Sequence, residues 1–177
     1  MAIQIGAKPD SGFDDPLGML KDCHRRIESF LNILCVVAEC APGRVLSDEE
    51  AGAVRSALQY FRSGGIRHTA DEEESLFPRL RGEFAAGRFE ELAALESDHR
   101  DANDLHEVVD TFYSMWISAG RLSEEDEQRL LSATKQLKHL YAQHIQVEER
   151  VVFPRAAQVL DSETIKAIGQ ELRARRK

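Results

Sequence analysis

The sequence predicts an all-α protein: an up-down-up-down four-helix bundle followed by a short C-terminal helix. Charged residues make up 31% of the 177 residues and aromatic residues only 7%, a composition typical of helices. Four long segments carry apolar residues at helical spacing, and short connections between them place successive helices antiparallel. The frame H-x3-E-E-x3-F-P-R, beginning at His68, recurs from His144, so the bundle contains an internal repeat.

We expect the first helix to begin near Asp14-Asp15-Pro16, where an acidic cap precedes a proline in the first turn. It should run to about Ala41, and its apolar periodicity places His24 on the buried face. The second helix opens with a capping box at 47–50 and extends toward Pro78. Gly64-Gly65 within it would either leave space for a small ligand or let helices approach closely.

The third helix should start near Arg88 and stop at Gly120, and the fourth should begin at Ser123. A last, amphipathic helix is expected from about Ser162 to Arg175, packed over one end of the bundle. We therefore divide the chain into a flexible leader, the bundle, and a short helix with a basic tail, at residues 1–13, 14–160 and 161–177.

Composition and charge exclude several classes of protein. The formal net charge of −8 argues against nucleic acid and anionic membranes as partners, and no segment has the roughly 18 apolar residues that a membrane span needs. The first 13 residues do not resemble a signal peptide, and the three cysteines form no C-x-x-C pair, so we expect reduced thiols and a cytoplasmic protein. Cys35 and Cys40 are expected in the core, Cys23 has a structural role, and residues 173–177 form a solvated basic tail.

The repeated frame has the spacing of a metal site. Residues i and i+4 of an α-helix lie on one face, so each H-x3-E pair points its imidazole and carboxylate in the same direction. Each pair also follows an isolated histidine at nearly the same distance. Facing each other across a bundle, the two units would supply ligands for two ions, iron, manganese or zinc. The predicted ligands are His24, His68, Glu72, His99, His144 and Glu148.

This pattern resembles the hemerythrin-like, or HHE cation-binding, family in its four-histidine, two-glutamate form. The resemblance covers about residues 14–160 and implies two iron ions bridged by Glu72, Glu148 and an oxo or hydroxo group. Oxygen-carrying hemerythrins have a further histidine where this chain has Asn103. The form found here is closer to iron-binding and nitric-oxide-stress members, including proteins of iron–sulfur cluster repair, although we expect no extra Cys-bearing domain of the kind that some of those carry.

Three other residues could surround the metals. His106 is two helical turns beyond His99, about 10.5 Å along the axis, which favours a core or outer position over a fifth ligand. Tyr141, three residues before His144, is read as an outer or core tyrosine, with a phenolate ligand or a hydrogen-bond donor to bound oxygen as the alternative. Asn103 is taken as a third outer residue, whereas His139 should face solvent and the E-x-x-H sequence at 96–99 is a coincidence.

These observations favour a non-haem di-iron protein that binds or reacts with oxygen, nitric oxide or peroxide, with a role in oxidative or nitrosative stress. The sequence leaves open whether this reaction makes it an enzyme. The alternatives are an iron storage, delivery or sensing protein, including iron–sulfur repair, and a bundle in which the metal is purely structural. The sequence names neither an electron donor nor a protein partner.

Overall fold

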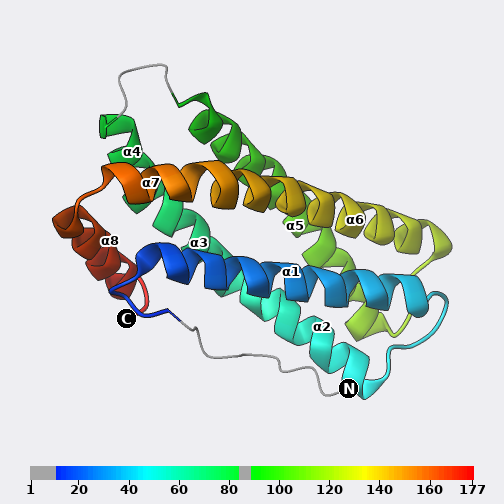
Figure 1. Ribbon diagram of the computed structural model, residues 1–177. Helices are drawn as coiled ribbons and strands as arrows, with labels where there is room; N and C mark the ends of the chain where they lie inside the picture. Colours follow the sequence, from blue (N-terminus) through cyan, green and yellow to red (C-terminus); the bar gives the residue numbers. More distant parts are fainter. Residues whose placement is uncertain (1–10, 84–88) are drawn as a thin grey trace.

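The chain folds into four long antiparallel helical segments and a short fifth helix that covers one end (Figure 1). The structure is a computed structural model that describes residues 11–83 and 89–177. The described elements are the α-helices α1 (Pro16–Cys40), α2 (Asp48–Tyr60), α3 (Ile66–Ala70), α4 (Phe77–Glu83), α5 (Glu90–Ala119), α6 (Glu124–Val147), α7 (Phe153–Val159) and α8 (Ser162–Ala174), with π-helical segments η1 (Phe61–Gly65), η2 (Asp71–Leu76) and η3 (Glu148–Val152) between them. The all-α class predicted from the sequence is confirmed.

The predicted helix signals act at the ends of these segments. Asp15 accepts a hydrogen bond from the backbone N–H of Gly18 and caps α1, and Ser47 and Glu50 form the capping box of α2. Gly120 ends α5 with a φ of 80°, a conformation that favours glycine because it has no Cβ. Ser123 caps α6. The predicted start near Arg88 lies outside the described residues, and the helix is described from Glu90.

The second helical segment continues past Pro78 and is described as far as Glu83. It does so because η2 widens the helix just before the proline: the N–H of Phe77 donates to the carbonyl of Glu72, five residues back. The second copy of the frame repeats this, since Phe153 donates to the carbonyl of Glu148 in front of Pro154. A wide turn gives room to a residue without a backbone N–H, so the Phe-Pro pair marks a π-turn rather than a helix end.

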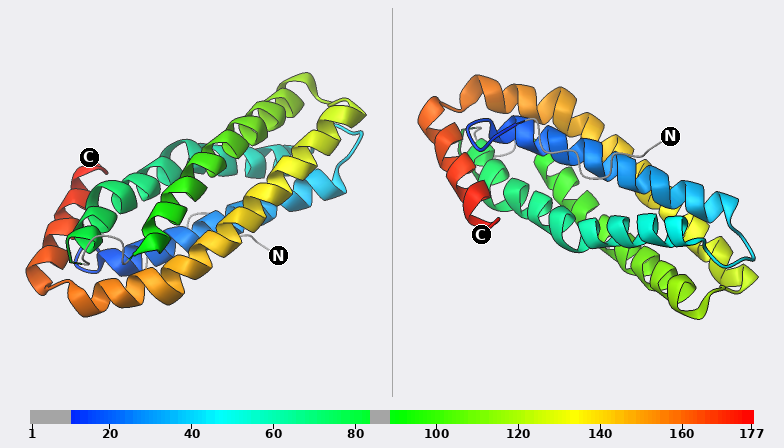
Figure 2. Two further views of the ribbon diagram at one scale, coloured as in Figure 1. Left: turned by 90° about the horizontal axis from the view of Figure 1, so that it is seen from above. Right: turned by 90° about the horizontal axis from the view of Figure 1, so that it is seen from below.

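Sequence neighbours are also neighbours in space around the bundle. α1 packs against α2 and α6, and α5 packs against α2 and α6, which closes a ring of four helices. Both views of Figure 2 show the 41–47 and 120–123 connections together at one end, with α8 across the other. This is the up-down-up-down order that short connections impose.

The hydrophobic core is divided into two clusters along the bundle axis. The cluster near the 41–47 connection includes Ile27, Leu34 and Trp116. The cluster beneath α8 includes Leu20, Phe77 and Phe153. His24 lies on α1 between Leu20 and Ile27, so a polar layer separates the two apolar clusters.

The basic C-terminal tip does not form a solvated tail. Arg175 and Arg176 bind the carboxylate of Asp71, at 3.1 and 2.6 Å, and Asp71 is fully buried. Arg175 also reaches the hydroxyl of Ser75 and the carboxylate of Glu74. A buried carboxylate needs charged partners, and here the last residues of the chain supply them to the π-turn that carries Glu72.

We expect the Arg175→Ala/Arg176→Ala double variant to be destabilised, because it leaves Asp71 buried without a cation. The expected loss is about 3 kcal/mol of unfolding free energy, or roughly 6–12 °C in Tm for a chain of this size. Thermal unfolding followed by circular dichroism measures it. The Lys177→Ala variant, which removes a charge from the exposed final residue, is the control. Equal melting of the double variant and the wild type would show that the tip contributes nothing.

The structure also bears on the expected leader and on the expected burial of the cysteines. Residues 1–10 of the expected leader lie outside the described residues, whereas Phe13 lies beneath the guanidinium groups of Arg173 and Arg176. Cys35 is buried as predicted, but Cys40, the last residue of α1, is exposed. No helix among the described residues is both long and apolar enough to cross a membrane.

Candidate metal centre

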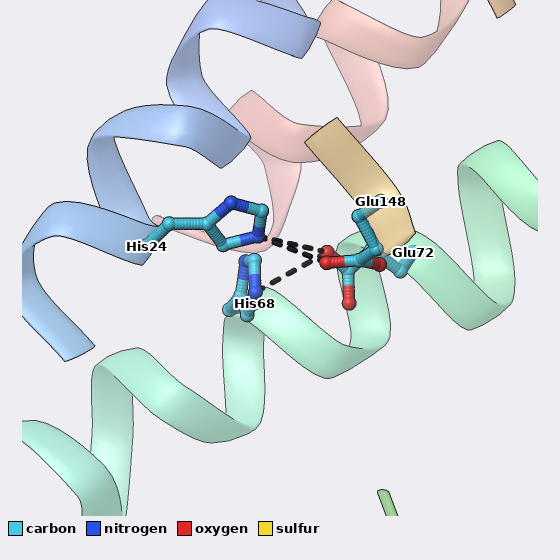
Figure 3. Close-up of side chains that lie close together, drawn as sticks. All are labelled: His24, His68, Glu72 and Glu148. Carbon is cyan, nitrogen blue, oxygen red and sulfur yellow. Dashed lines mark ion pairs between the residues drawn. The ribbon is translucent and has the colours of Figure 1, made fainter. Parts of the chain in front are cut away.

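The structure brings the six predicted ligands together in the polar layer between the two apolar clusters. We call them the His/Glu cluster: His24 from α1, His68 from α3, Glu72 from η2, His99 from α5, His144 from α6 and Glu148 from η3. Each is at most 5% exposed. Figure 3 shows the rings of His24 and His68 directed at the two carboxylates.

The two carboxylates lie between the two pairs of histidines. Oε1 of Glu72 is 3.2 Å from Nε2 of His68, and Oε2 of the same side chain is 3.3 Å from Nε2 of His99. Oε2 of Glu148 is 2.9 Å from Nε2 of His24 and 3.4 Å from Nε2 of His144. Each carboxylate therefore reaches both units of the repeat, which is the arrangement of a bridging ligand.

The donor atoms of the cluster have no hydrogen-bond partners. Among the described residues, every buried side-chain nitrogen or oxygen without a partner belongs to the His/Glu cluster. They comprise the Nε2 atoms of the four histidines, the four carboxylate oxygens and Nδ1 of His68. Nitrogens and oxygens this close, yet not aligned as hydrogen bonds, direct their lone pairs at a common space. Unpaired buried polar atoms are costly, so the residues fit metal ions as the missing partners.

Atoms from these residues form two groups compact enough to hold one ion each. The first contains His24, His68, Glu72 and Glu148, and the second contains Glu72, His99 and His144. Glu72 belongs to both groups. Mixed imidazole and carboxylate donors without thiolate suit iron, manganese or zinc.

Three further carboxylates, which the sequence analysis missed, hold the histidines from outside. Nδ1 of His24 is 2.8 Å from Glu149, Nδ1 of His99 is 2.7 Å from Glu73, and Nδ1 of His144 is 3.3 Å from Asp98. Glu73 and Glu149 are the second glutamates of the two H-x3-E-E frames, and each binds the isolated histidine of the other unit. A carboxylate on the outer nitrogen orients the ring and leaves Nε2 for the metal. The second glutamate of each frame was the feature of the sequence from which Glu73 and Glu149 could have been found.

Burial and neighbouring charges act in opposite directions on the protonation of the cluster. Burial lowers the pKa of His68 to about 4. Burial also disfavours charge on His24 and His99, but adjacent carboxylates outweigh it and raise the pKa of His24 to about 11 and that of His99 to about 9. The same imidazoles hold the pKa of Glu72 and Glu148 below the ordinary value despite burial. Both carboxylates are therefore ionised at neutral pH, the form that binds metal.

Comparison with known protein families gives the same result as the geometry. The Hemerythrin HHE cation binding domain model matches residues 15–156, which is most of the chain and includes the whole His/Glu cluster. The chain belongs to the hemerythrin HHE cation-binding family. The comparison with curated proteins gives no match. The match spans every residue of the His/Glu cluster, and the family resemblance found in the sequence is confirmed.

The hemerythrin-family site has two of the three expected outer residues beside it. Tyr141 is buried, and its hydroxyl is 3.1 Å from Nε2 of His106, which packs on Phe61. The ring of Tyr141 lies 6.3 Å from that of His144. Burial lowers the pKa of His106 to about 4 and raises that of Tyr141, so the hydrogen bond joins a neutral phenol and a neutral imidazole.

The other residues singled out in the sequence lie away from the cluster. Asn103 is exposed on α5 and makes no hydrogen bond to the cluster, so its role near the metals stays a prediction. His139 is exposed, as predicted. Glu96 pairs with Arg81 rather than joining the cluster, which agrees with reading its E-x-x-H sequence as a coincidence.

A surface pocket of about 780 Å³ approaches the site from the side of α5 and the η1–α3 segment. Its lining includes Tyr141, His106, Asn103 and Glu73. Gly65 lines it too, whereas Gly64 accommodates a neighbour: a Cβ there would lie 2.7 Å from the ring of Tyr60. Of the two roles considered for the glycine pair, space for a ligand therefore concerns Gly65 alone.

We expect the Tyr141→Phe variant to bind as much metal as the wild type. The hydroxyl that it removes is committed to His106, and the ring that packs beside His144 is retained. Metal analysis checks the content, and absorption spectra of the iron-loaded protein check for a lost phenolate band. A phenolate ligand, the alternative considered for this residue, would show itself through the loss of that band and of metal.

Proposed function

We propose that this hemerythrin-family protein holds two iron ions in the His/Glu cluster and that its function is to bind or react with a small ligand: oxygen, nitric oxide or peroxide. The unpartnered donor atoms of six buried residues carry the proposal, because they constitute a complete ligand set for two ions. His24, His68, His99 and His144 would bind terminally, and Glu72 and Glu148 would bridge. When bound, a pair of iron ions supplies electrons and open coordination positions for such a ligand.

The burial of the cluster supports a resident metal over a metal that is cargo. All six ligands are at most 5% exposed, and three of the histidines are fixed from outside by carboxylates. A protein that delivers or stores iron has to release it, whereas these ligands are enclosed between two apolar clusters. The arrangement therefore favours a reaction at the metal over iron storage, delivery or sensing.

The pocket beside Tyr141 supports a small ligand as the reactant. None of the six ligands lines this pocket, but Tyr141, whose ring lies 6.3 Å from that of His144, and Glu73, which holds His99, both do. A reactant that reaches the metals from this pocket has to pass between buried side chains, which favours a small molecule over a large substrate. We also propose that the protein acts in the cytoplasm, since its three cysteines are free, as in a reducing compartment.

The decisive experiment loads the full chain with ferrous iron without oxygen and measures its absorption spectrum before and after nitric oxide or peroxide is added. We expect two irons per chain and a spectral change with at least one of the ligands. Transfer of the iron to an external acceptor distinguishes the alternative, because a delivery protein loses its iron readily. Protein that holds two irons and responds to no ligand would support a structural metal and overturn the proposal.

Reversible oxygen carriage is not the expected outcome. Asn103 stands where the oxygen carriers have their additional histidine, and it is exposed. The described ligands would therefore leave an exchangeable coordination position on each iron. Stopped-flow mixing of the ferrous protein with oxygen should therefore show rapid and irreversible oxidation. Oxygen uptake that reverses under vacuum would contradict this prediction.

A further inference from the structure

The two ends of the His/Glu cluster differ in the groups that hold their histidines. At the end formed by His99 and His144, both Nδ1 atoms have a carboxylate, Glu73 at 2.7 Å and Asp98 at 3.3 Å. We call this the His99 end. At the other end, the His24 end, Nδ1 of His24 is 2.8 Å from Glu149, but Nδ1 of His68 has no partner in the described part of the chain.

The internal repeat identifies the missing group. Asp98 directly precedes His99, and its carboxylate holds the histidine of its own H-x3-E frame, His144. In the first unit, the residue directly before His24 is Cys23. Cys23 is buried and contacts Arg26, but a thiol is at most a weak hydrogen-bond acceptor. The repeat therefore has a carboxylate at this position in one unit only.

A carboxylate on the outer nitrogen strengthens a histidine as a ligand in two ways. It fixes the ring and its tautomer, and it increases the electron density on the nitrogen that faces the metal. Its anionic charge also offsets part of the charge of the ion. His68, fully enclosed and without such a partner, has neither benefit.

We propose that the two metal positions are inequivalent, with the His99 end binding its ion more tightly and Asp98 as the positioning residue responsible. The proposal rests on the proposed function, since it requires two bound ions. Loss of an outer carboxylate typically costs about 10–100-fold in metal affinity, and we expect a difference of about 10-fold or more between the ends.

Paired half-site variants of the full chain measure this difference. His24→Ala leaves both histidines of the His99 end, and His99→Ala leaves both histidines of the His24 end. Each is titrated with ferrous iron in the absence of oxygen, by calorimetry, after its melting curve has shown that it is folded. We expect the His24→Ala variant to bind one ion at least about 10-fold more tightly than the His99→Ala variant binds its ion. Equal affinities would overturn the proposal.

Exchanging the group before each isolated histidine tests the cause. Asp98→Asn should remove the advantage of the His24→Ala variant, and Asp98→Glu should restore part of it. Cys23→Asp should tighten binding in the His99→Ala variant. Asp101→Asn, at an exposed position on the same helix, is the matched control and should change neither affinity.

The intact cluster provides a second measurement if the half-site variants bind too weakly. Competition with a chelator should resolve a tighter and a weaker ferrous ion, and Asp98→Asn should weaken the tighter one selectively. An equal effect on both ions, or an effect on the weaker ion alone, would refute the role of Asp98. Failure of the wild type to bind two ions would instead refute the proposed function, so the two failures are distinguishable.

Discussion

Replacing Glu72 with alanine is expected to reduce the metal content from two ions per chain to one or none. Its two carboxylate oxygens are directed to different ends of the His/Glu cluster, 3.2 Å from His68 and 3.3 Å from His99. Glu72 is also the residue shared by the two groups that could each hold an ion. Its loss therefore removes a ligand from both positions at once. Elemental analysis of the purified variant measures the outcome.

Glu148→Ala should have a similar effect, because Glu148 lies between His24 and His144. Glu72→Gln separates charge from shape: an amide fills the same volume but binds cations weakly, so it too should lose metal. Glu107→Gln on the exposed surface of α5 is the control for the loss of one negative charge. Full retention of two ions by both alanine variants would be incompatible with bridging carboxylates.

Removal of the metal should lower the melting temperature more than any single substitution. The polar layer would then contain two ionised glutamates and four imidazoles with unpartnered donor atoms between two apolar clusters. Each ion present at 1,000 times its Kd stabilises the folded state by about 4 kcal/mol. Two ions together correspond to a shift of roughly 15–30 °C for a chain of this size.

Thermal unfolding of the chelated and reloaded protein measures this shift, and reloading should restore it. The apolar clusters on either side, around Leu34 and Phe77, oppose the effect because they do not depend on metal. Equal melting temperatures with and without metal would show that these clusters alone determine the stability and that the ions are peripheral to the fold.

The helices and the ligand set could be predicted from the sequence because both depend on local chemistry. Helical periodicity places His68 and Glu72 on one face whatever surrounds them, and caps such as Ser47 act within a single turn. The duplication then made the pattern specific, since each unit alone is too small to complete a site. Short connections fixed the order of the helices, and hence the convergence of the two units.

The wide turns at η2 and η3 could not be predicted from the sequence, because they depend on how the helix accommodates Pro78 and Pro154. Proline within a helical pattern ordinarily predicts an end or a kink. The segments continue because Phe77 and Phe153 donate one residue further back, to the carbonyls of Glu72 and Glu148. The ligand glutamates thus lie on widened turns, a detail that no periodicity contains.

Helix geometry is local and repeats every 3.6 residues, so the residue pattern was enough to assign the side chains that face the bundle axis. The groups that meet across the bundle are known only from the packed helices: Glu73 with His99, Glu149 with His24, and Arg175 with Asp71. It also placed Asn103 at the surface and left Nδ1 of His68 without a partner in the described residues. These pairings depend on the relative rotation and distance of helices far apart in the chain, which side-chain packing sets.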